Sequence, residues 1–391
     1  MKILFENFSD IVKRKSFLIS FGASLGTALI FFTIIFFATR EKENFFSEEI
    51  IASEVFFPLK FPVPDGWFFE EEEPADERPF SILTGEKIDE EFFSRRPLAV
   101  VVNNIRRALP QSGIASADLI YEMLAEGDVT RLVAIFQSNF PEKIGSIRST
   151  RDYFVDFAYN HDAIFIYHGG SPSGYAKIRS TGITNLDGGQ LEGKQGVFWR
   201  DTTYPDWGVY TDTRPREHSS YTGREQLETH FSQTNIRNKI GDDKSFGFNF
   251  GKIPAEKIGD AKKIIVPFSQ NYRRTFIFCD EEKIYLVENR DGAHRDALDA
   301  TQVSVANVLI QFAAMNIIAG DEAGRRNIRT VGEGMGRLAA NGEYFSVRWT
   351  KDSAASPTRW YFDDGTPLVL SPGKTWVCVF QTNGNVSFEN E

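Results

Sequence analysis

Charged side chains interrupt the apolar runs of residues 96–173, and this pattern constrains the fold more than any other. Leu98-Ala-Val-Val-Val is a continuous apolar run, which is typical of a strand buried on both faces. Two further apolar runs, 119–125 and 130–136, flank Glu126-Gly-Asp-Val and predict a hairpin. Charge that enters a core must be satisfied there. The stretch therefore predicts a sheet with a polar cluster built into it.

The predicted hairpin would place its charged side chains on one face. Its core face would carry Met123, Ala125, Leu132, Ala134 and Phe136. The opposite face would bring Arg131 diagonal to Glu122 and Glu126. This is either an ion-pair cluster that stiffens the sheet or a carboxylate site whose pKa the arginine sets. The two glutamate backbones would lie about 13 Å apart, whereas glycosidase carboxyls lie about 5 to 9.5 Å apart, which favours the structural interpretation.

Two arginines come just before a predicted helix. Ser149 and Asp152 form a capping pair, and an apolar helical face follows. Arg148 and Arg151 then lie at the positive end of the helix dipole, where cations are disfavoured. An anion beside them would offset this cost. It is either an internal carboxylate or a carboxylate or phosphate of a ligand, and both interpretations stay open.

A second polar segment follows the apolar run Ala163-Ile-Phe-Ile-Tyr. Strand, helix and strand together predict a βαβ unit that ends in His168-Gly-Gly-Ser-Pro. Strand ends of this kind bind ligands in α/β sheets. Ser171 before proline is expected to cap a helix rather than act as a nucleophile. His168 is a candidate general base or ligand contact, or else a structural hydrogen-bond donor.

Residues 182–250 are rich in Gly, Asp, Thr and Trp and predict long surface loops, which are often functional. Trp199 and Trp207 are flanked by Arg200 and Asp206. Such tryptophans suit stacking on sugar rings, and they equally suit anchoring a loop to the core. The sequence leaves both interpretations open.

Residues 255–388 read mainly as strands, with hairpin turns at Asn341-Gly and Asp364-Gly. Within them, 303–318 is either a strand pair or a helix. We therefore predict an α+β fold with an N-terminal transmembrane helix, an α/β domain with a mixed sheet at 96–250, and a mainly antiparallel β domain at 255–388.

Residues 17–39 contain no charged side chain. As a helix they would span about 34 Å, enough to cross a hydrocarbon core of about 30 Å. The basic run Lys13–Lys15 precedes them, so the positive-inside rule predicts a cytoplasmic tail at 1–16 and an extracytoplasmic bulk. A cleaved signal peptide is the alternative. The acidic, proline-containing residues 40–95 are expected to form a linker.

Composition limits the partners. The net charge of −10 argues against nucleic acid, because phosphate binding requires clustered Lys and Arg. The five histidines show no ligand spacing and there is no Cys-x-x-Cys, so neither a metal site nor a cofactor is predicted. Cys279 and Cys378 lie in strand-like runs, and a disulfide and two buried thiols both remain open.

The order of short motifs is also informative. In the first half the motifs are Arg96-Pro-Leu-Ala-Val-Val-Val-Asn-Asn, Pro110-Gln-Ser-Gly, Ala117-Asp, Tyr121-Glu, Glu126-Gly, Thr130-Arg, Ile135-Phe, Gly145-Ser-Ile-Arg-Ser-Thr-Arg and Gly169-Gly-Ser. In the second half they are Ala306-Asn-Val, Val331-Gly-Glu-Gly and Gly373-Lys-Thr-Trp. Together they resemble the YerB family of bacterial extracytoplasmic lipoproteins over residues 96–381.

This resemblance implies a two-part domain of unknown function on the outer side of the cell membrane, near wall synthesis. The chain lacks the lipobox cysteine of that family, so the transmembrane helix would replace the lipid. It also has Arg216-Glu-His where relatives have a Pro-His pair, which weakens any role for His218.

We therefore expect a single-pass, envelope-facing protein that binds an anionic or glycan ligand of the cell wall or a wall-assembly partner. The candidate ligand-binding residues are Glu122, Glu126, Arg131, Arg148, Arg151 and Ser171. The catalytic candidates are Glu122, Glu126 and His168. The alternative is a peptidoglycan-cleaving enzyme with Glu122 or Glu126 as a general acid whose pKa burial raises. A third interpretation is a scaffold that recognises only other proteins.

Overall fold

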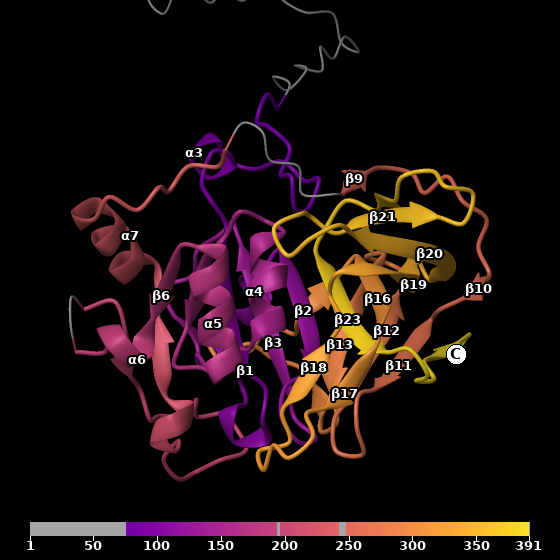
Figure 1. Ribbon diagram of the computed structural model, residues 1–391. Helices are drawn as coiled ribbons and strands as arrows, with labels where there is room; N and C mark the ends of the chain where they lie inside the picture. Colours follow the sequence, from indigo (N-terminus) through magenta and orange to yellow (C-terminus); the bar gives the residue numbers. More distant parts are fainter. Residues whose placement is uncertain (1–75, 194–195, 242–247, 391) are drawn as a thin grey trace, which may run out of the picture. The chain divides into compact units, whose positions relative to one another are not determined.

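The computed structural model describes residues 76–193, 196–241 and 248–390 (Figure 1). Within these ranges, 11 strands form one sheet in the order β10-β20-β19-β16-β23-β2-β3-β1-β5-β6, with β21 paired to β20. The strands are β1 Leu98–Asn103, β2 Leu119–Leu124, β3 Thr130–Phe136, β5 Ile164–Tyr167, β6 Asn185–Asp187, β10 Gly259–Asp260, β16 Asn307–Ala313, β19 Gly332–Ala340, β20 Glu343–Lys351, β21 Arg359–Phe362 and β23 Thr375–Gln381. The sheet is mixed, since β23 runs parallel to both of its neighbours, β2 and β16.

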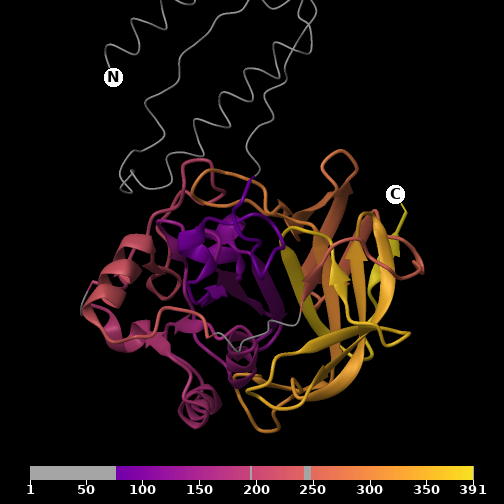
Figure 2. The same cartoon turned by 90° about the horizontal axis from the view of Figure 1, so that it is seen from above.

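A second sheet, antiparallel throughout its described pairs, covers one face of the first. Its strands are β11 Lys263–Pro267, β12 Arg273–Cys279, β13 Ile284–Asn289, β14 Gly292–Ala293, β15 Ser304–Val305 and β24 Ser387–Glu389. Side chains such as Phe276 and Val287 pack there with Trp376 of β23 in one apolar core. Figure 2 shows the C-terminal half of the described structure, in orange and yellow, beside the N-terminal half, in indigo and magenta.

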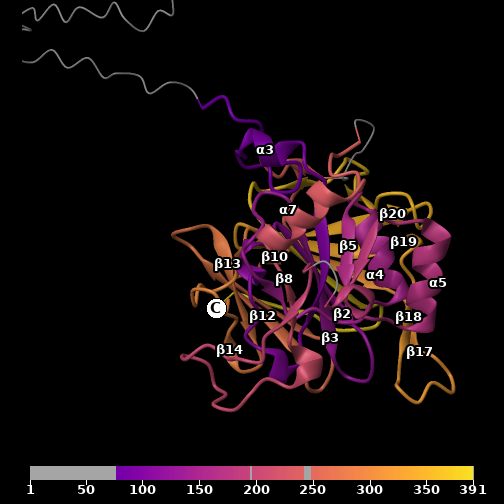
Figure 3. The ribbon, with the colours of Figure 1, turned by 90° about the vertical axis from the view of Figure 1, so that its left-hand side faces the viewer.

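Helices α4 (Asp152–Tyr159) and α5 (Pro172–Thr181) cover the opposite face of the main sheet beside β1, β3 and β5 (Figures 1 and 3), whereas Leu227 of α7 (Arg224–Gln233) packs in the same apolar core as the second sheet. The helices are α3 Glu90–Phe93, α4 Asp152–Tyr159, α5 Pro172–Thr181, α6 Gly188–Leu191 and α7 Arg224–Gln233, with 3-10 turns η1 Arg106–Ala108, η2 Ile114–Ser116 and η3 Arg216–His218. The small sheets contain β4 Ile144–Gly145, β7 Trp199–Arg200, β8 Ser220–Thr222, β9 Asn249–Phe250, β17 Met315–Ile317, β18 Arg326–Ile328 and β22 Val369–Leu370.

Burial on both faces explains why the central strands carry continuous apolar runs. All six residues of β1 and all seven of β3 are buried. Helix α4 packs Phe154, Phe157 and Ala158 on one side of this sheet, and the second sheet packs on the other. The sequence left it open whether residues 303–318 form a helix or a pair of strands, and the structure shows strands there. Both cysteines are free thiols, and Cys378 is fully buried.

The predicted fold class, α+β with an N-terminal transmembrane helix, is wrong. Strands account for 39% of the described residues and helices for 15%, so this part of the chain is mostly β. The βαβ pattern around α4 and α5 is real, but these helices are short and the loops after residue 182 stay largely irregular. Residues 17–39 lie outside the described part of the chain. In the described ranges, no helix is both long enough and apolar enough to span a membrane.

The domain boundaries stay a prediction, and two observations bear on them. Leu83, Ile88 and Phe92, from the segment expected to be a linker, are buried in the described structure. Strands from both predicted domains, moreover, belong to one sheet.

Candidate functional site

The β2–β3 hairpin forms as predicted, but its register separates the candidate charges. Leu132 lies opposite Glu122, and Arg131 lies opposite Met123. Directly opposed residues share a face, so Glu122 and Arg131 project from opposite faces of the sheet. The prediction assumed a four-residue turn, whereas five residues, 125–129, separate the paired strands. A shift of one residue moves every side chain to the other face.

Four of the predicted residues do form a cluster. Glu126, in the hairpin loop, forms ion pairs with Arg131 of β3 and Arg151 at the start of α4. The Arg131 Nη1 donates to the Ser149 carbonyl at 2.9 Å. The side chains of Arg131 and Arg151 are only 4% and 7% exposed, while that of Glu126 is 26% exposed. We call Glu126, Arg131, Arg148 and Arg151 the arginine cluster.

The charges in the arginine cluster do not balance. The Arg148 Nη1 donates to the Glu217 carbonyl oxygen at 2.9 Å, and no carboxylate of the described residues forms an ion pair with it. Burial lowers the pKa of Arg148, as does the charge of Arg151. Burial and the Arg151 charge also lower the pKa of Arg131 to about 9, so it remains protonated at neutral pH. Three guanidiniums thus surround one carboxylate.

Buried donors in the same cluster lack acceptors. The Nε atoms of Arg131 and Arg151 have no hydrogen-bond partner among the described residues. Arg151 is the N-cap residue of α4, and no side chain caps that helix. The predicted cap by Ser149 is therefore wrong. Buried polar atoms normally find partners, so the cluster is a site where an anion would be favourable.

Ser171 and His168 occupy structural positions beside this cluster. The Ser171 Oγ accepts from the Gly174 N–H at 3.0 Å and caps α5, as predicted. The Arg200 Nη2 lies 3.0 Å from the His168 Nε2 and can only donate, so this nitrogen accepts. The Nδ1 therefore holds the proton and donates to the Ser220 Oγ at 3.0 Å. Burial and the Arg200 charge lower the pKa of His168. Because its lone pair is already engaged, His168 is poorly prepared to act as a general base.

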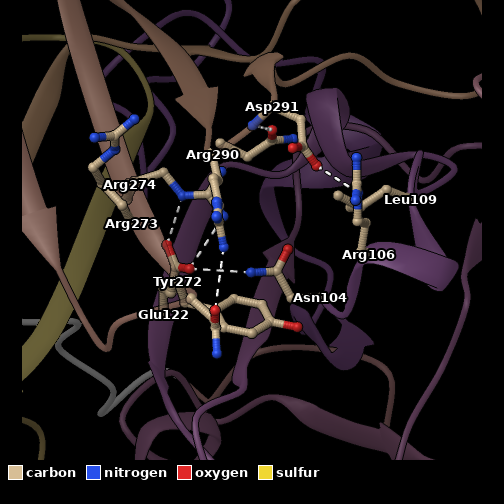
Figure 4. Close-up of a pocket in the computed structure, with 11 residues that line it drawn as sticks. Asn104, Arg106, Leu109, Glu122, Tyr272, Arg273, Arg274, Arg290 and Asp291 are labelled. Atoms are coloured by element: carbon tan, nitrogen blue, oxygen red, sulfur yellow. Dashed lines mark hydrogen bonds and ion pairs between the residues drawn. The ribbon is translucent and has the colours of Figure 1, made fainter.

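Glu122 belongs to a separate network at the floor of a cavity of about 250 Å³ (Figure 4). Its carboxylate accepts from Arg274 at 2.8 and 3.1 Å, from the Asn104 amide at 3.1 Å and from the Thr130 hydroxyl at 2.9 Å. Glu122 and Arg274 are both only 2% exposed. Sequence reasoning did not identify Arg274. The sequence did carry a signal for it, because side chains alternate between the two faces of a strand. This alternation places Arg274 on the same face as Phe276 and Phe278.

The network continues through His294. The Arg274 Nη1 donates to the His294 Nδ1 at 2.8 Å, which leaves the proton on Nε2 for the Gln111 Oε1 at 2.7 Å. Burial lowers the pKa of His294 well below its usual value. The Arg274 guanidinium also lies 4.7 Å from the centre of the Trp376 ring. These side chains come from both halves of the sequence.

Comparison with known proteins gives the family. Residues 83–237 match the family described as "Protein of unknown function (DUF3048) N-terminal domain", and residues 264–377 match its C-terminal domain. A Bacillus subtilis (strain 168) protein named "Putative lipoprotein YerB" is 31% identical over 299 residues, which cover 75% of this chain and 84% of that protein. This chain belongs to the DUF3048 family.

The fold agrees with this DUF3048 assignment. The crystal structure of the YerB protein from Bacillus subtilis superposes with a TM-score of 0.66 at 30% identity, covering 79% of this chain and 100% of the other. The resemblance to the YerB family is thereby confirmed. In this DUF3048 protein, the ion pair between Glu122 and Arg274 joins the residues matched by the two family domains.

The separation of the two glutamates bears on the hydrolase alternative for this DUF3048 protein. Glu122 accepts four hydrogen bonds, and Glu126 is bound by two arginines. A general acid must hold a proton that it can give to substrate. Neither carboxylate is surrounded in a way that favours this, so the alternative stays a prediction with less geometric support. Among the described residues, no group of three His, Cys, Asp or Glu side chains is placed to hold a metal ion.

Proposed function

We propose that this protein is a membrane-attached component of the cell envelope that binds an anionic ligand at the arginine cluster. The observation that carries the proposal is the charge imbalance, with one carboxylate among three guanidiniums. Two of these guanidiniums are buried and retain an unpartnered Nε among the described residues. Buried charge without a counter-charge is costly. A bound anion would supply that counter-charge.

The chemistry of the cluster suits a carboxylate or a phosphate. Guanidinium groups bind both through paired N–H donors, and the uncapped start of α4 adds backbone donors of the same polarity. Ligands of this class in the envelope include acidic wall polymers, which we propose as the natural ligands. Glu126 would then hold Arg131 and Arg151 in position, while Arg148 would contact the ligand.

The location is proposed from the relative named as a lipoprotein, a class of protein attached to membranes. Fractionation of cells should place this protein with the membranes. A protease added to protoplasts should digest the folded region from outside. Recovery of the folded region in the cytosol would contradict the location.

Binding can be tested by isothermal titration of the full-length protein with pyrophosphate and with glucuronate at low salt. We expect at least one of the two anions to bind. Arg148→Gln should weaken that binding at least ten-fold. Glu126→Gln should strengthen binding, because glutamine keeps an acceptor oxygen that can hold the arginines in position but removes the negative charge that competes with the ligand. Added salt should weaken binding, as it screens charge pairs.

The matched control is Arg359→Gln, which removes an exposed arginine of β21 that forms no ion pair among the described residues. It should bind like the wild type. If neither anion binds the wild type, or if Arg148→Gln and Arg359→Gln bind equally well, the arginine cluster is only a structural network.

A further inference from the structure

Two adjoining cavities form a groove where the two family domains meet. The first, of about 250 Å³, lies over Glu122 and is walled by Asn104, Asn271, Tyr272 and Arg290. The second, of about 520 Å³, is walled by Trp207, Tyr210 and His294. Both cavities are lined by Arg106, Leu109, Asn289 and Asp291. We call this continuous hollow the junction groove.

Trp207 is exposed although the loop that carries it is firmly held. The Tyr204 hydroxyl donates to the Arg107 carbonyl at 2.7 Å, and the buried Arg214 donates to the Ala108 carbonyl at 2.5 Å. The Tyr204 and Tyr210 rings lie 5.0 Å apart. These contacts anchor the loop, so Trp207, which is 46% exposed, is not needed for that purpose. A large apolar ring held at the mouth of a cavity is instead typical of a ligand contact.

The remaining wall of the junction groove is rich in planar polar groups. Asn271 and Asn289 supply amides, while Arg290 and Asp291 supply a guanidinium and a carboxylate. The Arg290 Nη1 reaches the Asn271 Oδ1 at 3.2 Å, and no described carboxylate forms an ion pair with it. Such groups present donors and acceptors in pairs. Adjacent hydroxyl groups on a sugar ring present the complementary pairs.

The floor of the groove is fixed before any ligand arrives. Above it, an exposed ion pair between Arg106 and Asp291, at 2.9 Å, joins two of the lining segments (Figure 4). The floor is fixed by the buried contact of Arg274 with Glu122 and His294. A rigid, polar floor with one exposed aromatic ring differs from the deep apolar cavity that a lipid chain requires.

We infer that the junction groove binds an oligosaccharide, with one sugar ring stacked on Trp207 and the next ring hydrogen-bonded to Arg290, Asn271 and Asn289. This site is separate from the arginine cluster and does not depend on the proposed function. It uses different residues, which lie on both family domains.

The test is saturation-transfer NMR and isothermal titration of the full-length protein with two tetrasaccharides. One is chitotetraose, which is neutral, and the other alternates glucuronate with N-acetylglucosamine. We expect at least one to bind with a millimolar or lower Kd. Trp207→Ala should weaken that binding at least ten-fold, Trp207→Phe should retain most of it, and Arg290→Ala should weaken it independently.

Two controls separate this inference from other effects. Met335→Ala removes a side chain that is also 46% exposed but lies on β19, and it should leave binding unchanged. For chitotetraose, which offers no anion to the arginine cluster, Arg148→Gln should also leave binding unchanged, since Arg148 does not line the groove. The inference is overturned if neither tetrasaccharide binds, if Trp207→Ala binds like the wild type, or if dioctanoyl phosphatidate binds the groove in preference to both.

Discussion

Glu122 supplies the negative charge that Arg274 requires in the interior of the protein. Both side chains are 2% exposed and are joined by two hydrogen bonds. Glu122→Gln would leave the Arg274 guanidinium buried without a counter-charge. We therefore expect the free energy of unfolding to fall by about 3 to 5 kcal/mol, measured by urea denaturation at pH 7.

A second variant makes this prediction specific. Combining Glu122→Gln with Arg274→Gln removes both charges, so the double variant should be more stable than the sum of the two single changes predicts. Glu91→Gln, at an exposed position, should change stability by no more than about 0.5 kcal/mol. Additive effects at positions 122 and 274 would show that the two side chains do not interact.

His161 should make stability depend on pH. It is 1% exposed, and burial lowers its pKa to about 3. Below its unfolded pKa of about 6.5, the unfolded chain therefore binds a proton that the folded protein does not. Stability is then lost as the pH falls, by about 2 kcal/mol between pH 7 and pH 5 for this group alone.

The variant His161→Gln isolates this contribution, since glutamine can still pair with the Tyr121 hydroxyl, which lies 2.8 Å from the His161 Nε2. A comparison between proteins is needed because burial raises the pKa values of Asp118 and Asp156, which act with the opposite sign. Urea denaturation of both proteins at pH 7 and pH 5 gives the comparison. Equal losses of stability in both would show that His161 does not titrate as described.

At the scale of single elements, the cap of α5 gives a direct prediction. The Ser171 Oγ accepts from the Gly174 N–H, and Pro172 occupies the first turn. Ser171→Ala should lower the free energy of unfolding by about 1 kcal/mol, whereas Ser171→Asp should keep most of the stability. Ser180→Ala, at an exposed position near the other end of the same helix, is the control and should have a smaller effect in thermal denaturation. Unchanged stability in Ser171→Ala would contradict the capping role.

The hairpin of β2 and β3 shows what the sequence can and cannot predict about an element. Apolar runs on either side of a glycine-containing turn were enough to predict both strands. The register depended on whether four or five residues form the loop, and the sequence contains no signal strong enough to decide this. That one residue determined whether Arg131 would meet Glu122 as well as Glu126, and in the structure it meets only Glu126 of the two. Local patterns therefore predicted the charged cluster but assigned one of its members wrongly.

At the scale of the whole molecule, the missing information was long-range pairing. β23 lies between β16 and β2, although about 250 residues of sequence separate it from β2. Nothing local to Thr375–Gln381 indicates that neighbour. The partner of Glu122 was missed for the same reason, since Arg274 lies in the C-terminal family domain. A sequence can show that a strand is buried on both faces without showing what covers it.

The shared sheet predicts that the two family domains unfold together. Separating them would expose the edge of β2 that pairs with β23, break the buried contact of Glu122 with Arg274, and divide the apolar core around Trp376. Each of these losses falls on both domains, so neither retains a complete core alone. Calorimetry of the full-length protein should therefore show the folded region melting in one transition, with equal calorimetric and van't Hoff enthalpies. A fragment of residues 76–255 should lack a cooperative transition. Two separate transitions, or a fragment that melts cooperatively, would show that the shared sheet does not couple the domains.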